Sequence, residues 1–197
     1  MCFIAMIAHL SMTFYRRNLP HWFPDGHSLF LTWRLYGSLP KTPEQQAKRL
    51  GSMSDGRRFV LRDRDLAMST KGPHWLAEPR IADALEQIIK EAESVSNLYA
   101  LEAYVIMPNH VHMLIAPHAP PATITWRVKG ASARIANRIL RRSGKPFWQD
   151  ESFDHWVRSN AEDDKLRSYI HLNPVAAGLV KRPEDWPWSS AAQKSTG

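Results

Sequence analysis

Two histidines separated by one residue, His110 and His112, are the first candidates for chemistry in this chain of 197 residues. On a β-strand, residues i and i+2 point to the same face, so both imidazoles could bind one metal ion while Val111 points into the core. In a chain with nine histidines, roughly 0.4 such pairs are expected by chance. The spacing alone is therefore a weak signal, and two histidines that only pack in a core are the alternative.

Tyr169 and Asn173 form a second candidate pair. They are four residues apart in a segment with helical patterning, so a phenol and an amide share one helix face. A tyrosine with a pKa of about 10 is a poor nucleophile at neutral pH, unless a nearby cation or base stabilises the phenolate or takes its proton. Packing is the more common role of a helical tyrosine, so this pair also needs further support.

A strongly basic segment lies between Arg127 and Gln149, with seven Lys or Arg residues and no acidic residue. Four of its arginines fall within roughly 60° of arc on a predicted helix: Arg127, Arg134, Arg138 and Arg141. Such a stripe can follow a phosphate backbone. Trp126 and Trp148, near its ends, either stack on unpaired bases or pack in the core.

The composition favours a nucleic-acid partner and limits the kind of metal site. Lys and Arg outnumber Asp and Glu by 26 to 19, which gives a net charge of +7 and a pI near 9.8. The single cysteine, Cys2, allows no disulfide and no cysteine metal site within one chain. No apolar run approaches the ~20 residues of a membrane span, and the apolar start lacks a basic leader. We expect a cytoplasmic protein with no membrane partner.

The elements that must position these residues follow from the periodicity of apolar side chains. Residues 28–36 alternate and predict a half-buried strand, and residues 98–106 and 110–115 predict a hairpin around Pro108. Helical spacing predicts helices from Pro79, over 123–142 with a buried stripe, and over 161–172, where Pro174 ends the last one. That stripe is Ile124, Val128, Ala131, Ile135 and Ile139. The polar residues 40–72 suggest a variable insertion. This order predicts an α+β fold, an antiparallel sheet flanked by helices.

Several segments, in this order, resemble one family, the REP-associated tyrosine transposases within the single-tyrosine HUH nucleases. The segments are Arg16 to Trp22 (RRNLPHW), Tyr104 to His112 (YVIMPNHVH), Phe147 to Arg158 (FWQDESFDHWVR), Tyr169 to Val175 (YIHLNPV), Ala177 to Val180 (AGLV) and Asp185 to Ser190 (DWPWSS). The ordered set is far more specific than the histidine pair. The resemblance implies an HUH-nuclease fold with a ferredoxin- or RRM-like palm, one domain over 16–192, an N-terminal extension over 1–15 and a tail over 193–197. Ala176 departs from the pattern, because the family usually has Lys or Arg there.

The resemblance also implies roles for the candidate residues. His110 and His112 would bind a divalent metal, with Asn173 as a third ligand, and Tyr169 would be the nucleophile. We expect Mg²⁺ or Mn²⁺ as the metal, since both accept imidazole and amide ligands. The implied reaction is cleavage and rejoining of single-stranded DNA beside a hairpin from a repetitive extragenic palindrome, through a covalent 5′-phosphotyrosine. Such an enzyme would act at the nucleoid as a monomer or a homodimer.

Contacts to DNA are expected at basic and aromatic positions along the chain. The predicted set is Arg16, Arg17, Arg127, Lys129, Arg134, Arg138, Arg141, Trp148 and Arg158. For Arg158, an ion pair with Asp154 is the alternative. Three other functions stay open: a non-cleaving module that binds hairpin nucleic acid, a metal-dependent hydrolase that uses water instead of tyrosine, and a basic structural domain with core histidines.

Overall fold

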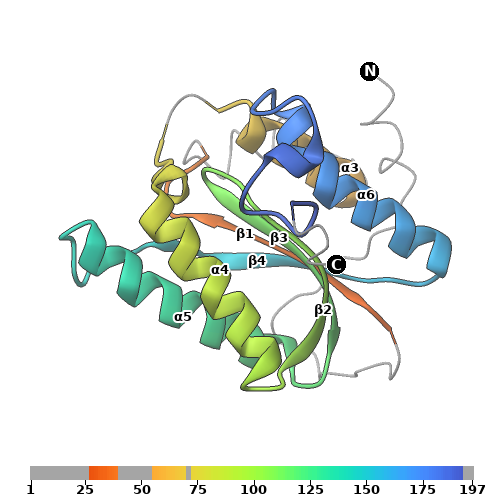
Figure 1. Cartoon of the computed structure of the whole chain (residues 1–197), viewed down its shortest axis with the longest axis horizontal. Helices are drawn as coiled ribbons and strands as arrows, with labels where there is room; N and C mark the ends of the chain where they lie inside the picture. The colour runs from red at the N-terminus through yellow and green to blue at the C-terminus, as the bar shows by residue number, and fades with distance from the viewer. Residues whose placement is uncertain (1–26, 40–54, 70–71, 193–197) are drawn as a thin grey trace.

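A computed structural model of the chain describes residues 27–39, 55–69 and 72–192. Its centre is an antiparallel sheet of four strands in the order β2-β3-β1-β4. The strands are β1 (Leu29–Leu35), β2 (Tyr99–Ile106), β3 (His110–Pro117) and β4 (Trp148–Trp156). Helices cover both faces of this sheet (Figure 1). The predicted α+β class is thus confirmed.

The predicted hairpin is confirmed as β2 and β3. Its turn holds Pro108 where no ladder bond is needed, and the Met107 N–H donates to the His110 carbonyl at 2.9 Å. The register places Ile106 opposite Val111 and Val105 opposite His112. Because side chains alternate along a strand, this register directs both histidines to one face and Val111 to the other.

Strand β1 is buried on both faces, not on one as its alternation predicted. Leu29, Leu31, Trp33 and Leu35 belong to the core on one side of the sheet. Phe30 belongs to a second core on the other side, and Thr32 faces that side as well, where it contacts His112. The alternation of β1 correctly predicted which residues share a face. It does not show that helices cover the face with Thr32 and Arg34 as well.

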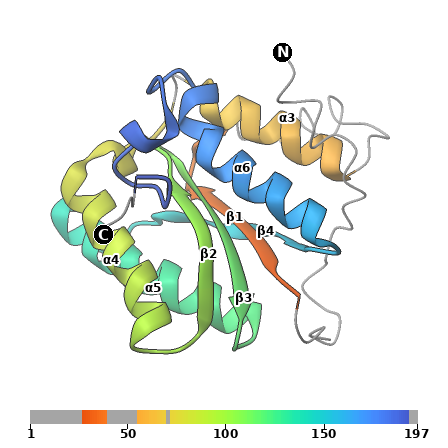
Figure 2. The same cartoon turned by 45° about the vertical axis from the view of Figure 1, so that its right-hand side comes forward.

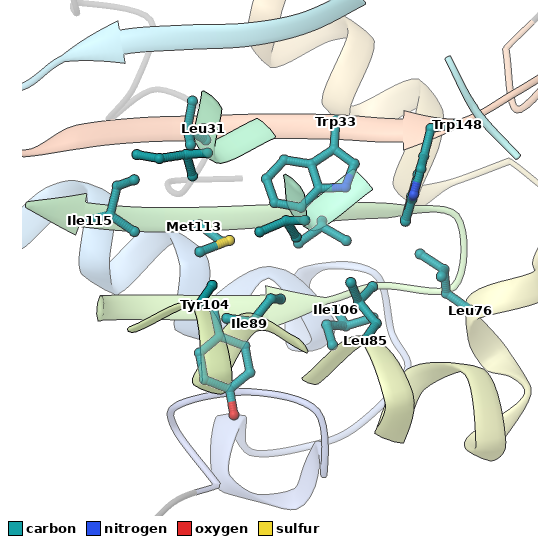
Figure 3. Close-up of a cluster of buried hydrophobic side chains, with 14 of the residues drawn as sticks. Leu31, Trp33, Leu76, Leu85, Ile89, Tyr104, Ile106, Met113, Ile115 and Trp148 are labelled. Carbon is teal, nitrogen blue, oxygen red and sulfur yellow. The ribbon is translucent and has the colours of Figure 1, made fainter. Parts of the chain in front are cut away.

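Helices α4 (Pro79–Ser94) and α5 (Pro121–Ile139) cover the first face (Figure 1). A short 3-10 turn, η1 (Trp75–Ala77), precedes α4, which begins with the expected proline in its first turn. Figure 3 shows Leu85 and Ile89 of α4 against Tyr104, Ile106 and Met113 of the sheet. The buried stripe of α5 differs from the prediction: Ser132 and Ala136 follow Ile124 and Val128, whereas Ile135 is 37% exposed. Two of the buried positions in the second half of α5 are thus small residues.

Helices α3 (Asp55–Ala67) and α6 (Asn160–Ala176) lie side by side over the second face (Figures 1 and 2). The α3 helix falls inside residues 40–72, so the predicted insertion is wrong at least for this part, which belongs to the core layer. The prediction that Pro174 ends the last helix is also wrong, because α6 continues through it to Ala176. Proline has no backbone N–H, so Pro174 costs the helix one hydrogen bond. Because it lies two residues before the end of α6, the final turn still forms.

The segment that follows η2 (Pro183–Asp185) lies along the outer edge of β2. The Ile106 N–H donates to the Trp188 carbonyl at 2.8 Å, and the Ser190 N–H donates to the Tyr104 carbonyl at 3.0 Å. This pairing satisfies backbone groups that an edge strand would otherwise expose. Several predictions fall on residues that the structure does not describe: the extension over 1–15, the tail over 193–197 and the DNA contacts Arg16 and Arg17. No described helix is long and apolar enough to cross a membrane.

We expect Ile89→Ala to lower the free energy of unfolding by about 2–5 kcal/mol, because it leaves a cavity at a side chain that is fully buried between α4 and the sheet. Urea unfolding followed by circular dichroism measures the loss. Val95→Ala is the control, since Val95 is 80% exposed just beyond the end of the same helix and should cost no more than about 0.5 kcal/mol. Equal losses in both variants would contradict the placement of α4.

Candidate metal and tyrosine site

His110 and His112 share the sheet face that α3 and α6 cover. Both residues are fully buried, and their ring centroids are 4.8 Å apart. The i and i+2 geometry expected for a strand is therefore confirmed. Two imidazoles pointing into one enclosed volume satisfy the first requirement for a shared metal ion.

Asp63 of α3 completes this cluster. Its Oδ1 lies 3.0 Å from His112 Nε2 and 3.4 Å from His110 Nε2. Ligand atoms of the three residues all lie within 4.8 Å of one another, so Asp63, His110 and His112 could hold a metal ion. Asp63 is not among the ligands predicted from the sequence, because the polar residues 40–72 suggested an insertion. The missed signal was helical spacing: Phe59, Asp63 and Leu66 recur on one helix face, and all three are buried.

The hydrogen bonds of His110 favour a cation beside Asp63. Asn109 Nδ2 donates to the Leu66 carbonyl at 2.9 Å, which fixes the orientation of the amide. Asn109 Oδ1 can only accept, so His110 Nδ1, at 2.6 Å, must carry the proton. Burial lowers the pKa of His110 to about 3, against the opposing effect of Asp63, so this imidazole is neutral at neutral pH. Its Nε2 lone pair then faces the Asp63 carboxylate, and two acceptors in contact need a positive charge between them.

Unpaired polar atoms point to the same conclusion. Asp63 Oδ1, His110 Nε2 and Asn173 Oδ1 are buried and have no hydrogen-bond partner among the described residues. A buried polar atom without a partner costs about 1–3 kcal/mol. One bound cation would satisfy Asp63 Oδ1 and His110 Nε2 at once. Two nitrogen donors with carboxylate and amide oxygens suit a divalent ion of the Mg²⁺ or Mn²⁺ class.

Neighbouring side chains hold the two imidazoles in place from behind. Thr32 Oγ1 of β1 lies 2.7 Å from His112 Nδ1, and Asn109 Oδ1 lies 2.6 Å from His110 Nδ1. Histidine ligands usually bond through the ring nitrogen that faces away from the metal, which fixes the ring and its tautomer. Both rings therefore present Nε2 to the space beside Asp63.

Tyr169 and Asn173 join the cluster from α6. The Tyr169 hydroxyl donates to Asp63 Oδ2. Asn173 Nδ2 donates to the same oxygen at 3.2 Å and lies 3.3 Å from His112 Nε2. The expectation that positions i and i+4 share one face is met, and Asp63 is the residue that connects this pair to the histidines.

The charge of Asp63 controls the protonation of this site. Burial alone would raise the pKa of its carboxyl, but the charge and hydrogen bond of His112, with smaller contributions from His110 and Tyr169, hold it well below its usual value. Burial raises the pKa of the Tyr169 phenol well above 10, and the charge of Asp63 raises it further. At neutral pH the site therefore contains a carboxylate, and a phenol that keeps its proton until something accepts it.

The arginine stripe does not border this site. Arg127, Arg134 and Arg138 are exposed on α5, and Arg141 is exposed just beyond its end. Figure 1 shows α5 on the other side of the sheet from α3 and α6. Arg158, which is also exposed, lies between β4 and α6, where its backbone N–H donates to Glu162 Oε2 at 2.7 Å.

Two of the predicted DNA contacts have structural positions instead. Trp148 is 6% exposed, and its indole N–H donates to the Ser132 hydroxyl at 3.0 Å. The core-packing alternative therefore holds, and the predicted stacking role is corrected. The Lys129 ammonium donates to the carbonyls of Gln149 at 2.8 Å and Asp150 at 3.1 Å. These bonds hold the irregular start of the edge strand β4, so we remove Lys129 from the DNA-binding set. Trp126, in contrast, is 74% exposed on α5.

Comparisons with known proteins identify the family of the chain and relatives with a similar fold. The family described as "Transposase IS200 like" matches residues 66–173, more than half of the chain. The REP-associated tyrosine transposase of Escherichia coli (strain K12) is 27% identical over 95 residues, which are 47% of this chain and 54% of that protein. The chain thus matches about half the length of that relative. A solved structure of a REP-associated tyrosine transposase bound to a REP hairpin has a similar fold, with a TM-score of 0.55 and 20% identity over 91% of this chain and 82% of that chain.

The matched family segment contains both histidines, Tyr169 and Asn173, but it begins three residues after Asp63. Asp63 therefore enters the site through the structure alone. A test of the metal site must include this residue.

We expect Mn²⁺ to raise the melting temperature by about 5–10 °C when its concentration is 100 times its dissociation constant. The reason is that the metal relieves the contact between acceptors at Asp63 and His110. Asp63→Asn and His110→Ala should each lose most of this increase, measured as melting with and without metal. His118→Ala is the control, because His118 is an exposed histidine that contacts Asn97. An increase that is the same in all variants would place the metal elsewhere.

Proposed function

The chain belongs to the family of IS200-like transposases, and from this membership we propose that it cleaves and rejoins single-stranded DNA, with Tyr169 as the nucleophile. One observation carries the proposal. The phenol of Tyr169 and the ligand atoms of His110 and His112 converge on a single carboxylate, that of Asp63. A phosphate bound at this point would meet the nucleophile and the metal ligands together, as nucleophilic catalysis requires.

The residues that would hold the metal are Asp63, His110 and His112, with Asn173 as a further ligand. Amide groups bind metals through oxygen, so this role needs the amide of Asn173 to turn its Oδ1 toward the cluster. When bound, a divalent ion, Mg²⁺ or Mn²⁺, supplies positive charge that polarises the scissile phosphate and offsets the charge that builds on its oxygens.

The proposed chemistry is an exchange of one phosphate ester for another. The Tyr169 oxygen forms a bond to phosphorus, and the bond from phosphorus to the 3′ oxygen breaks, which leaves a 5′-phosphotyrosine. Asp63 Oδ2 already accepts the hydrogen bond of the phenol, so it is the nearest acceptor for the phenolic proton. The departing 3′ oxygen takes a proton from solvent. Rejoining reverses these steps with another 3′-hydroxyl, so no nucleotide cofactor is needed.

We propose hairpin DNA from repetitive palindromes as the substrate, in line with the hairpin bound by the structural relative. The stripe of Arg127, Arg134, Arg138 and Arg141 would contact the phosphates of the hairpin, and the exposed Trp126 would stack on an unpaired base. Because α5 covers the other face of the sheet, the hairpin and the cleaved strand would meet different sides of the molecule. Such a partner places the protein at the nucleoid.

A non-cleaving hairpin-binding module is the second candidate, and the enclosure of the site favours it. His110 and His112 are fully buried beneath α3 and α6. A scissile phosphate can reach them only if side chains of these helices move. The binding module needs the arginine stripe but not Tyr169, so one substitution separates the two functions.

We expect purified wild-type protein to form a covalent adduct with end-labelled hairpin-bearing single strands in the presence of Mn²⁺, and Tyr169→Phe to form none. The substitution removes only the hydroxyl oxygen that would bond to phosphorus. The adduct is seen as a denaturation-resistant band on a gel. Tyr36→Phe is the control, since Tyr36 is partly exposed at the end of β1 and should keep the adduct. Cleavage without an adduct would indicate a hydrolase, and tight binding without cleavage would indicate the binding module.

We expect the triple variant Arg127→Gln, Arg134→Gln and Arg138→Gln to weaken hairpin binding and to reduce the slope of log K against log salt by about 2–3, because each lost phosphate contact removes about 0.7–0.9. Fluorescence anisotropy over a range of salt concentrations measures this slope. The matched control removes the same charge at Arg80, Lys181 and Arg182, which are exposed away from α5. Equal slopes in the two triple variants would mean that only the overall charge matters.

A further inference from the structure

Arg34 of β1 lies on the face of the sheet that holds the two imidazoles. The register places Thr32 opposite His112 and Arg34 opposite His110. The contact of 2.7 Å between Thr32 Oγ1 and His112 Nδ1 shows which face these pairs share. Directly opposed residues have Cβ atoms about 4.5–5.5 Å apart. The side chain of Arg34 therefore leaves the sheet beside His110, on the side of the metal cluster.

Arg34 also marks the place where this covered face meets solvent. Six of the seven residues of β1 are buried, and Arg34 is the one that is partly exposed. A charged residue in a central strand covered on both faces is unfavourable unless it has a partner. Its Nη1 donates to the hydroxyl of Ser38 at 3.3 Å, a contact that keeps the guanidinium near the end of the strand. A ligand that reaches His110 from this side would pass the guanidinium.

Tyr169 lies on the other side of the imidazole pair. The centroid of its ring is 5.5 Å from that of His112 and 6.3 Å from that of Phe30. Phe30, Thr32 and Arg34 follow one another on this face at intervals of about 6–7 Å. Tyr169 thus lies toward the Phe30 end of the pair, and Arg34 lies at the His110 end. The nucleophile and the guanidinium flank the two imidazoles.

The negative charges at the site can be offset by the guanidinium of Arg34. Asp63 contributes one negative charge, a phosphodiester contributes another, and further charge builds on the phosphate oxygens during transfer. A guanidinium presents parallel N–H donors that fit two oxygens of a phosphate, and it stays protonated at any working pH. Arg34 can therefore supply fixed positive charge on the side that Tyr169 does not occupy.

We propose that Arg34 binds a phosphate of the substrate strand, either the scissile phosphate or its immediate neighbour on the His110 side. This inference rests on the proposed function for its substrate, a single strand of DNA. It adds a binding residue in β1, a strand that precedes the matched family segment. It also gives the strand a direction across the site, from Tyr169 toward His110 and Arg34.

The test measures binding in a Tyr169→Phe background, so that no adduct forms, with and without Mn²⁺. Single methylphosphonates, which remove the charge of one phosphate, are moved along the strand. With Arg34 present, we expect a loss of about tenfold or more in affinity at one phosphate, the scissile one or its neighbour, because this is the usual size of a hydrogen bond to a charged group. With Arg34→Gln, the unmodified strand should bind about tenfold more weakly, and the same methylphosphonate should cause no further loss.

Two further variants separate this role from general charge and from folding. Arg80→Gln removes an exposed arginine from α4, on the other face of the sheet, and should leave the methylphosphonate pattern unchanged. Arg34→Lys keeps the charge, so the salt slope should stay constant while the penalty at the single phosphate falls. Arg34→Gln should reduce the slope by about 0.7, the value for one single-strand phosphate. Melting temperatures show that each variant is folded, and if Arg34→Gln is not, the Arg34→Lys comparison decides.

The proposal would be overturned if every methylphosphonate lowered the affinity of Arg34→Gln as much as it lowers the affinity of the protein with Arg34. Unchanged DNA affinity in Arg34→Gln would overturn it as well. Failure of the proposed function gives a different result. In that case wild-type protein forms no adduct on any strand, while the binding measurements still show whether Arg34 contacts one phosphate.

Discussion

A buried carboxylate that lies against two imidazoles sets the positions of the elements around it. Asp63 and His110 are both buried, and they present acceptor atoms to each other at 3.4 Å. Such an arrangement is unfavourable unless a cation lies between the acceptors. Three layers of structure maintain it: β3 fixes the spacing of the imidazoles, Thr32 and Asn109 hold the orientation of their rings, and α3 delivers the carboxylate. A metal ion that bound between these acceptors would add stability to the fold.

The sheet separates two kinds of chemistry. Its second face holds the buried titratable groups between α3 and α6, and its first face is closed by an apolar core beneath α4 and α5. The exposed arginines of α5 therefore stand outside the low-dielectric site and do not shift the pKa of Tyr169 or Asp63. Charge that attracts a polyanion over long distances belongs on such a surface. Charge that acts on a reacting phosphate must lie close to the buried site. Arg34 is the partly exposed residue of β1 on that face of the sheet.

The sequence predicted the parts of the site that depend on local periodicity. The alternation of β2 and β3 predicted a hairpin, and with it the common face of His110 and His112. Helical spacing predicted the common face of Tyr169 and Asn173. What local patterns cannot show is which distant element supplies the missing charge. Asp63 and the histidines are more than 40 positions apart, and only packing of α3 on the sheet brings them together.

Other errors have the same origin. The aromatic character of Trp148 fits base stacking and core packing equally well, and its burial against Ser132 decided between them. Lys129 belongs to a basic segment, but its ammonium bonds to the neighbouring strand. In α5, Ser132 and Ala136 are buried where the predicted stripe had Ala131 and Ile135, and the helix packs mainly on α4. Tertiary contacts override local preference at each of these positions.

The enclosure of Tyr169 bears on how the proposed intermediate would survive. A phosphotyrosine must persist until a 3′-hydroxyl arrives, and water that reached the phosphorus first would turn strand transfer into hydrolysis. The rings of Phe30 and Phe59 lie 6.3 and 6.2 Å from the ring of Tyr169, so part of the lining around this ring is apolar. An apolar lining excludes water and strengthens electrostatic contacts within the site. The same packing raises the pKa of the phenol and so slows its activation. A site built for hydrolysis would gain nothing from this cost, whereas a site that must protect a covalent link between two transfer steps would.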